Sequence, residues 1–178
     1  MKKLSVFALF FIFFCAVQAQ SGYFIKIEGI EGESMDKDHK GWSDLLSFSQ
    51  AIHKPGSGVT GASRRRGDVI LEDIVCVKEI DKSSPKLQEA ASKGTVFPKV
   101  EIHLTTTIKG VKQTYYAYEL KNVLITSYSI LGNNETVPSE NISINFEEIK
   151  AIYTAYDDKG KKAGNVEYSW KVEKGTDR

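Results

Sequence analysis

Cysteine is nearly absent from this chain, which limits how the fold can be held together. The sequence contains Cys15 and Cys76, and only Cys76 lies outside the apolar N-terminal stretch. A single cysteine cannot form an internal disulfide, so we expect the folded part to be stabilised by packing and by sheet hydrogen bonds. Cys76 stands among Ile and Val residues and is expected to be a small core residue rather than a nucleophile.

The motifs of common enzyme classes are also missing. The three histidines are far apart, and none belongs to a metal-binding spacing such as H-E-x-x-H. There is no G-x-S-x-G nucleophile elbow and no phosphate-binding G-x-x-x-x-G-K-[ST]. Asp36 begins a weak match to a calcium loop, but Lys40 takes one ligand position and Ser47 replaces the bidentate glutamate. We therefore expect no catalytic site, no metal and no cofactor.

Neither sign of charge dominates. The chain has 24 Lys and Arg residues against 23 Asp and Glu, and removal of Lys2 and Lys3 with the N-terminal stretch leaves 22 against 23. Proteins that coat nucleic acid or an anionic membrane are usually clearly basic. Neither nucleic acid nor a membrane surface is expected as a partner.

The N-terminus has the layout of a secretory signal peptide. Lys2 and Lys3 precede an apolar run from Leu4 to Val17, and small residues at Val17 and Ala19 suit signal peptidase. We predict a signal peptide over residues 1–19 and one domain over 20–178, with export to the periplasm or the medium. The run is shorter than the roughly 20 apolar residues of a comfortable membrane span. An uncleaved anchor, or lipid attachment at Cys15, is the alternative.

The rest of the chain alternates with the period of two that is typical of β-strands. The strand expected over Asp68–Ile80 is apolar on both faces, so we expect other parts of the protein or another subunit to pack against each face. Lys109-Gly110 is expected to form a tight hairpin turn. A bulge is expected near Glu147-Glu148, where the apolar phase slips.

Only one good helix is expected. Ser84 can cap it, Pro85 fits its first turn and Gly94 suits its exit. The pattern as a whole predicts an all-β fold: a compact antiparallel β-barrel or sandwich of about eight strands with one short flanking α-helix.

A charged arm over Glu33–Trp42 separates the first two strands and is longer than a hairpin needs. Such an arm is either disordered or used for contact with a partner. Trp42 is an interface anchor or an ordinary core residue, and both interpretations stay open. The Gly/Ser-rich loop over 53–66 ends in three arginines, which dock on an acidic neighbour or are solvated. The candidate assembly residues are Asp36, Lys37, Asp38, His39, Lys40, Trp42, Arg64, Arg65 and Arg66.

Two other binding functions compete with assembly. Arg66-Gly67-Asp68 spells an adhesive tripeptide, although three residues match often by chance. Aromatic residues in the strands could line a sugar-binding face, or they are ordinary core and cross-strand pairs. The aromatic residues concerned are Tyr115, Tyr116, Tyr118, Tyr153, Tyr156, Tyr168 and Trp170.

Several stretches, in order, resemble one known family. YFIKIEGIEGES, KDHKG and LLSFS look like the opening of the haemolysin-coregulated protein (Hcp) family, which forms the tube of the bacterial type VI secretion system. The likeness continues through IDKSSPKLQEAASKG, LKNVLITSYSILG and VPSENISINFEEIKAIY. The resemblance implies a small β-barrel with a flanking helix, homo-hexameric rings that stack into a hollow tube, and effector proteins and other secretion-system components as partners.

The signal peptide is a departure from that family. The resemblance implies subunits that assemble in the cytoplasm and carry no export signal. Two readings therefore stay open: a subunit that builds the tube, and an exported relative that keeps the fold without building it.

The predicted cleavage has a direct test. Protein recovered from the periplasm or the medium should give an intact mass that begins near Gln20, because Ala19 lies where signal peptidase cleaves. An intact Met1 in a membrane fraction would show an anchor instead.

Overall fold

The structure is a computed structural model, and it describes residues 21–54, 69–172 and 176–177. The predicted signal peptide, the three arginines at 64–66 and the Arg66-Gly67-Asp68 tripeptide lie outside these ranges. The elements found are β1 (Gly22–Ile27), β2 (Ser43–Leu45), β3 (Ser47–Ser49), β4 (Ile52–His53), β5 (Ile70–Leu71), β6 (Ile74–Glu79), α1 (Ser84–Lys93), β7 (Val96–Ile108), β8 (Val111–Leu131), β9 (Ser139–Asn145), β10 (Glu148–Tyr156), β11 (Lys162–Lys171) and β12 (Thr176–Asp177).

A closed antiparallel barrel forms the body of the molecule. β1 pairs with β7, β7 with β8, β8 with β9, β9 with β6 and β6 with β3. β2 pairs back to β1, and only Leu46 separates β2 from β3. The Leu46 amide donates to the Val77 carbonyl at 2.8 Å and continues the ring of hydrogen bonds. The prediction of an all-β antiparallel barrel with one short helix is confirmed.

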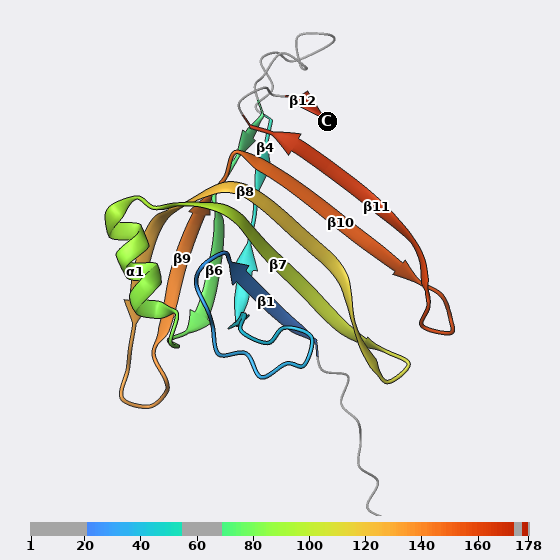
Figure 1. Cartoon of the computed structure of the whole chain (residues 1–178), viewed down its shortest axis with the longest axis horizontal. Helices are drawn as coiled ribbons and strands as arrows, with labels where there is room; N and C mark the ends of the chain where they lie inside the picture. Colours follow the sequence, from blue (N-terminus) through green and yellow to red (C-terminus); the bar gives the residue numbers. More distant parts are fainter. Residues whose placement is uncertain (1–20, 55–68, 173–175, 178) are drawn as a thin grey trace, which may run out of the picture.

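The β10–β11 hairpin lies outside this barrel. β8 is 21 residues long, and β10 pairs along the half of it that β9 leaves free. β11 then pairs with β10, and β12 adds only two residues at one end of β11. Figure 1 shows this hairpin extending from the body on the side opposite α1.

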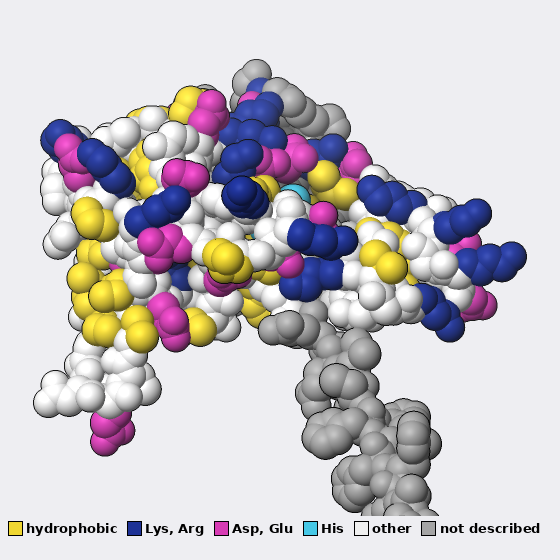
Figure 2. Space-filling model, turned by 60° about the horizontal axis from the view of Figure 1, so that its bottom comes forward, with side chains coloured by type: hydrophobic (Ala, Val, Ile, Leu, Met, Phe, Trp, Pro, Cys, Tyr) yellow, Lys and Arg dark blue, Asp and Glu magenta, His cyan; other side chains and the backbone are white. Residues whose placement is uncertain are grey.

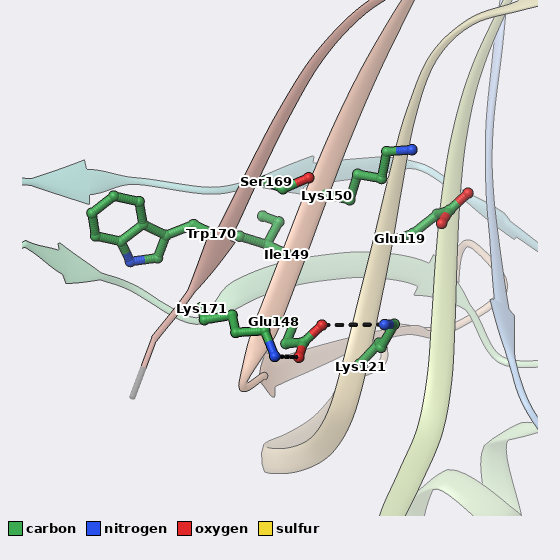
Figure 3. Close-up of a pocket in the computed structure, with 8 residues that line it drawn as sticks. All are labelled: Glu119, Lys121, Glu148, Ile149, Lys150, Ser169, Trp170 and Lys171. Carbon is green, nitrogen blue, oxygen red and sulfur yellow. Dashed lines mark hydrogen bonds and ion pairs between the residues drawn. The ribbon is translucent and has the colours of Figure 1, made fainter. Parts of the chain in front are cut away.

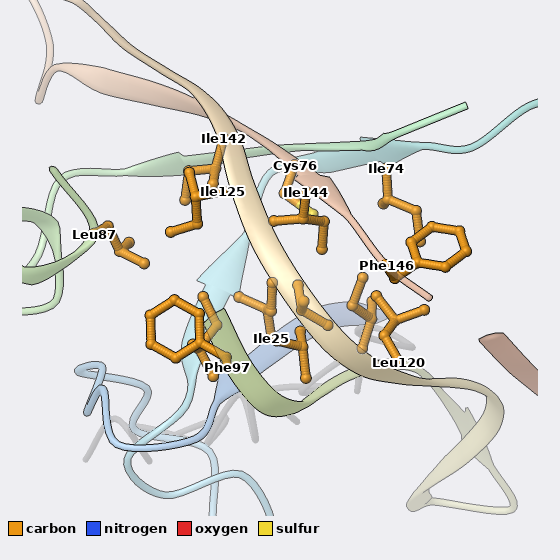
Figure 4. Close-up of a cluster of buried hydrophobic side chains, with 14 of the residues drawn as sticks. Ile25, Ile74, Cys76, Leu87, Phe97, Leu120, Ile125, Ile142, Ile144 and Phe146 are labelled. Atoms are coloured by element: carbon orange, nitrogen blue, oxygen red, sulfur yellow. The ribbon is translucent and has the colours of Figure 1, made fainter. Parts of the chain in front are cut away.

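Among the described residues, eighteen buried side chains form one cluster that fills the barrel and reaches Ile149 on β10. Figure 4 shows Ile25, Leu120 and Ile144 reaching the cluster from different strands, with Leu87 joining it from α1. Cys76 is fully buried among them, and this burial raises the pKa of its thiol to about 12. The expectation of a core cysteine is confirmed.

The helix begins one residue earlier than expected. Ser83 is the capping residue, and Ser84 is the first helical residue. The Ser84 hydroxyl accepts a hydrogen bond from the Asp81 amide at 2.9 Å, so it closes the turn that leads into the helix. Gly94 ends the helix with a φ of 65°, a left-handed conformation that favours glycine.

The predicted long strand over Asp68–Ile80 is wrong in extent. β5 pairs with β4 in a separate two-stranded sheet, and β6 belongs to the barrel. The strand is interrupted between them at Asp73. The Asp73 carboxylate accepts hydrogen bonds from Thr126 and Asn145 at 2.5 and 2.7 Å. These two hydrogen bonds connect the residues between β5 and β6 to β8 and β9.

The predicted bulge near Glu147-Glu148 is also corrected. The register is unbroken, since Asn145 pairs with Leu124 and Glu148 pairs with Lys121. Asn122 on the facing strand has a φ of 50°, so β8 bends beside the break between β9 and β10. The alternation of apolar residues shifts by one position here because β8 and its paired strands bend together. No extra residue is inserted in either strand. The Lys109-Gly110 turn is confirmed, with φ values of 51° and 78°.

A buried charge cluster ties α1 to the barrel. Lys78 on β6 is fully buried, and its Nζ lies 2.7 Å from Glu140 Oε1 on β9 and 2.9 Å from Asp81 Oδ1. Ser43 on β2 donates to the other oxygen of Asp81 at 2.8 Å. Tyr128 on β8 donates to Glu140 at 2.6 Å. The cluster therefore joins four strands to the turn that begins α1.

Among the described residues no helix is long and apolar enough to cross a membrane.

Removing the buried lysine should destabilise the barrel strongly. Lys78→Met leaves the Glu140 charge buried without its cation, which costs about 3–5 kcal/mol in the free energy of unfolding. The control is Lys93→Met, because Lys93 forms an exposed pair with Glu89 that is worth less than about 0.5 kcal/mol. Urea unfolding measures both, and a loss below about 1 kcal/mol for Lys78→Met would contradict the structural role of the cluster.

Candidate assembly interface

The apolar face of the large sheet continues beyond the barrel onto the β10–β11 hairpin, here called the wing. Three cross-strand rows run from β1 through β7, β8 and β10 to β11: Tyr23, Leu104, Tyr116, Tyr153 and Val166; Ile25, Ile102, Tyr118, Ala151 and Tyr168; Ile27, Val100, Leu120, Ile149 and Trp170. Paired residues share a face, so these rows form one surface. Its barrel half is core, and the core extends onto the wing at Ile149 and Ala151, which are 2% and 6% exposed.

Exposure rises along these rows toward β11. Ile25 and Ile102 are buried, whereas Tyr153, Val166 and Tyr168 are 46%, 71% and 38% exposed. We call these last three residues the wing patch. In addition, β11 lies near the border of the sheet, because within the described ranges β12 pairs with it only at Trp170 and Lys171. An apolar face near the border of a sheet is a surface suited to contact with another chain.

Ion pairs on the opposite face connect the strands of the wing. Glu148 on β10 lies 3.2 Å from Lys121 on β8 and 2.6 Å from Lys171 on β11, so one carboxylate bridges three strands. Lys150 and Glu167 form a further cross-strand pair at 2.9 Å. Figure 3 shows Glu148 between the two lysines, with Trp170 and Ile149 nearby. The wing patch is therefore presented on a braced sheet.

A second apolar surface lies at the other side of the molecule, where β8 ends beside α1. Its exposed members are Ile80, Ile130, Leu131 and Val137, which we call the helix-side patch. Ile80 and Ile130 also line a shallow groove of about 370 Å³ with Pro85 of α1. Figure 2 shows apolar side chains gathered on the side of the molecule that carries the β8–β9 hairpin. The two patches differ in residues and in position.

The charged arm over Glu33–Trp42 folds back on its own barrel. Its two ends meet through hydrogen bonds from the Gly32 amide to the Gly41 carbonyl at 2.9 Å and from the Ser34 amide to the Trp42 carbonyl at 2.8 Å. A side chain at residue 32 would meet the Trp42 carbonyl at 2.3 Å, so only glycine fits there. The sequence therefore closes the arm locally.

A histidine at the centre of the arm fixes it to β1 and β7. The His39 ring is 3% exposed and stacks on Phe24 with centroids 4.1 Å apart. Its Nδ1 lies 2.8 Å from Asp36, and its Nε2 lies 3.0 Å from Nδ1 of His103. Lys112 on β8 donates to the other oxygen of Asp36 at 2.7 Å. The arm is thus held by a chain of four polar side chains.

These contacts perturb two pKa values. Partial burial acts to raise the pKa of Asp36, but hydrogen bonds from Lys112 and His39 prevail and lower it to about 2. Burial, together with the adjacent His39, lowers the pKa of His103 to about 4. At neutral pH, Asp36 is therefore ionised and His103 is neutral.

The structure separates the residues proposed for assembly. Lys37, Asp38 and Lys40 are exposed on the arm, whereas Asp36, His39 and Trp42 point into it, with Trp42 only 9% exposed. Trp42 packs against His103 with ring centroids 4.5 Å apart. Its ordinary core role is therefore the one seen within a single copy of the chain. Arg64, Arg65 and Arg66 lie outside the described residues.

Sequence reasoning named Tyr153 and Tyr168 only as candidates for sugar binding, and it singled out neither the wing patch nor the helix-side patch as an assembly surface. Val166, Tyr168 and Trp170 alternate in the last long strand, which is the pattern of a half-buried strand. That pattern cannot show that the cover for this face is missing, because only the barrel closure places β11 outside the core. One signal in the sequence could have indicated an uncovered face: many apolar strands follow a single short helix, which is too small to cover them all.

Among the described strands, five of the seven aromatic residues considered for sugar binding lie on the apolar face of the sheet, and these are Tyr116, Tyr118, Tyr153, Tyr168 and Trp170. Tyr116 and Tyr118 are half-buried, pack against the core and contact each other at 5.1 Å between centroids. Tyr156 lies on the opposite face of the sheet from Tyr153 and donates to the Thr114 carbonyl at 2.8 Å. No group of three or more His, Cys, Asp or Glu side chains in the described ranges is arranged to hold a metal.

Comparison with known proteins places these features in a family context. The family model described as "Type VI secretion system effector, Hcp" matches residues 24–153. Protein hcp1 of Pseudomonas aeruginosa is 33% identical over 151 residues, which cover 84% of this chain and 93% of that protein.

Solved structures agree with the sequence comparison. A solved structure of a type six secretion system protein superposes with a TM-score of 0.82 at 27% identity, covering 89% of this chain and 100% of that one. Hcp1 from Salmonella typhimurium gives a TM-score of 0.74 at 22% identity, covering 89% of this chain and 99% of that one, and shows a likeness of fold.

Neutralising Asp36 should loosen the arm at neutral pH. Because its pKa in the folded protein lies below its ordinary value, the carboxylate stabilises the fold above pH about 4, and this contribution disappears as the pH falls toward 2. Asp36→Asn should lower the free energy of unfolding by about 1–2 kcal/mol at pH 7. Asp38→Asn is the control, because Asp38 is exposed, and it should cost less than about 0.5 kcal/mol. Equal stability of wild type and Asp36→Asn at pH 7 would contradict this role.

Proposed function

Because this chain belongs to the Hcp family of the type VI secretion system, we propose that it is a self-assembling subunit whose copies close head to tail into a ring. The resemblance to the family favours six copies, stacking of rings into a hollow tube, and effector proteins and other secretion-system components as partners. A structural role of this kind requires no catalytic group.

The observation that carries the proposal is the pair of unlike apolar patches on opposite sides of the subunit. The wing patch is exposed on β10 and β11, and the helix-side patch is exposed near α1. Contact between two different patches is heterologous, so it propagates from copy to copy until the rotation closes a ring. Two copies joined by one shared patch would leave the other patch exposed on each of them.

The energetics of this contact follow from what each patch exposes. Large hydrophobic side chains are exposed to solvent in the single chain, among them Val166, Tyr153 and Leu131. Burial of apolar surface contributes about 25 cal/mol per Å², and aromatic residues are enriched among interface hot spots. The braced sheet of the wing also loses little conformational freedom on binding, which favours affinity.

The polar face of the same sheet suits the inside of a hollow ring. Opposite the apolar rows, the face carries Glu101, Glu119, Lys150 and Glu167 on four adjacent strands. A mixed-charge surface of this kind stays hydrated and can contact a protein cargo through polar groups. We propose that this face lines the lumen and meets effector proteins there.

The exposed charges of the arm are proposed to set the register between copies. Lys37, Asp38 and Lys40 would meet opposite charges on a neighbour or, for Asp38, the arginines at 64–66. Exposed ion pairs contribute only about 0–1 kcal/mol each. They would therefore select an orientation, while apolar burial supplies most of the affinity.

Export by the signal peptide is also proposed. The protein would act in the periplasm or outside the cell after cleavage near Ala19. Assembly in that compartment, rather than in the cytoplasm, is what separates this chain from the family pattern that its sequence resembles.

Charge placed in either patch should abolish the ring. Val166→Asp in the wing patch and Ile130→Asp in the helix-side patch each force a carboxylate into an apolar contact, so each variant should be monomeric at tens of micromolar. The control is Val111→Asp, because Val111 is an exposed valine on the β7–β8 hairpin outside both patches. Light scattering coupled to size exclusion measures the mass, and electron microscopy shows the ring.

A mixture of the two variants distinguishes the heterologous contact from an isologous one. Each variant keeps one intact patch, and the two intact patches are complementary. The mixture should therefore form heterodimers that cannot extend. Wild type that stays monomeric would contradict the ring, and a mixture without heterodimers would contradict the pairing of these two patches.

A further inference from the structure

One hydrogen bond between two histidines joins the middle of the arm to the barrel. His39 Nε2 and His103 Nδ1 are 3.0 Å apart. Such a bond needs an N–H on one ring and a bare nitrogen on the other. When both rings are protonated, both facing nitrogens carry hydrogen and both rings carry positive charge. The pair can therefore hold the arm with no added proton or with one, but not with two.

The two rings do not have the same surroundings. Its Nδ1 faces Asp36 at 2.8 Å, so a positive His39 is balanced by a carboxylate. The ring is also enclosed by Phe24, stacked at 4.1 Å, and by the edge of Trp42 at 5.0 Å between centroids. His103 has no such counter-ion at its facing nitrogen, so positive charge on both rings is balanced on the His39 side alone.

Charges on every neighbouring element act on this second proton. On β7, Glu101 favours the protonated form of His103, while Lys99 opposes it, as does Lys26 on β1. Lys112 on β8 neutralises Asp36 in part. The remaining charged groups that line the groove beside the two rings are Lys37 and Asp38 on the arm, Glu119 on β8 and Lys162 on β11.

We propose that the His39–His103 pair is an acid-sensitive latch, which releases the arm from β1 and β7 when the second ring takes up a proton. Release uncovers Phe24 and Trp42, which the closed arm buries, and it frees the charges of the arm. The effect on ring contacts rests on the proposed function, whereas the latch itself is a property of the single chain.

The pH range of the latch follows from the two states of His103. In the closed arm its pKa is about 4, and in the open arm it returns toward the ordinary value of 6.5. The open state therefore binds more protons below pH 6.5, and the opening equilibrium rises as the pH falls, until it levels off near pH 4. Asp36, with a pKa of about 2, stays ionised throughout this range and does not supply the transition.

Hydrogen–deuterium exchange of residues 33–42 tests the latch. In wild type, protection relative to the intrinsic exchange rate at the same pH should fall roughly twentyfold between pH 7 and pH 5. His103→Asn places a neutral amide N–H where Nδ1 donates, so its arm should keep the same protection at both pH values. The matched control is His53→Asn, because His53 is exposed and pairs with Glu72, and it should keep the wild-type response.

A measurement on the wild type covers the case in which His103→Asn fails to fold. The ring nitrogens of His103, followed by NMR, should titrate with the same midpoint as the loss of arm protection. Arm protection that does not change between pH 7 and pH 5 would overturn the latch, and so would the same pH response in His103→Asn. Arm opening in a chain that stays monomeric at both pH values supports the latch and contradicts only the ring.

Discussion

The molecule is shaped by one constraint: the apolar face of its main sheet is longer than the barrel that covers it. β8 is 21 residues long and pairs with β7 on one edge and with β9 and then β10 on the other. The half beside β9 curls into the barrel and buries Val123 and Ile125. The half beside β10 continues into the wing, so its apolar cross-strand rows extend through β10 to β11. Because those rows begin in the core, the wing cannot turn its apolar side elsewhere without a change of register along the whole sheet.

Two clusters of buried polar side chains fix the parts of the chain that are not strands. Lys78 and Glu140 hold the turn into α1, and His39 with Asp36 holds the arm. Each cluster costs desolvation and is stable only when all of its members are paired. In the first cluster, both charged partners of the central ion pair, Lys78 and Glu140, are fully buried. The His39 cluster lies at the surface beside a groove, where protonation can reach it, and this difference separates a structural cluster from a regulated one.

The sequence allowed the fold class, the turn at Lys109-Gly110, the core role of Cys76 and the position of the helix to be predicted, because each depends on local periodicity or turn chemistry. The break at Asp73 and the joint bend at Asn122 were not predicted, since they depend on hydrogen bonds and pairing between distant strands. For the same reason the arm was expected to be disordered or to contact a partner, and its folding back on its own barrel was not predicted. Its charges gave no indication that His39 would find His103, 64 residues away, as a buried partner.

Hydroxyl-radical footprinting of the wing tests the central claim most directly. The measurement follows oxidation of Tyr153, Val166 and Tyr168 as the protein concentration is raised, with Val111 as an exposed reference. The account predicts that the three wing residues become protected over the same concentration range in which the mass rises, while Val111 remains reactive. Wing residues that stay equally reactive in the assembled protein would show that the open apolar face is not what joins the subunits.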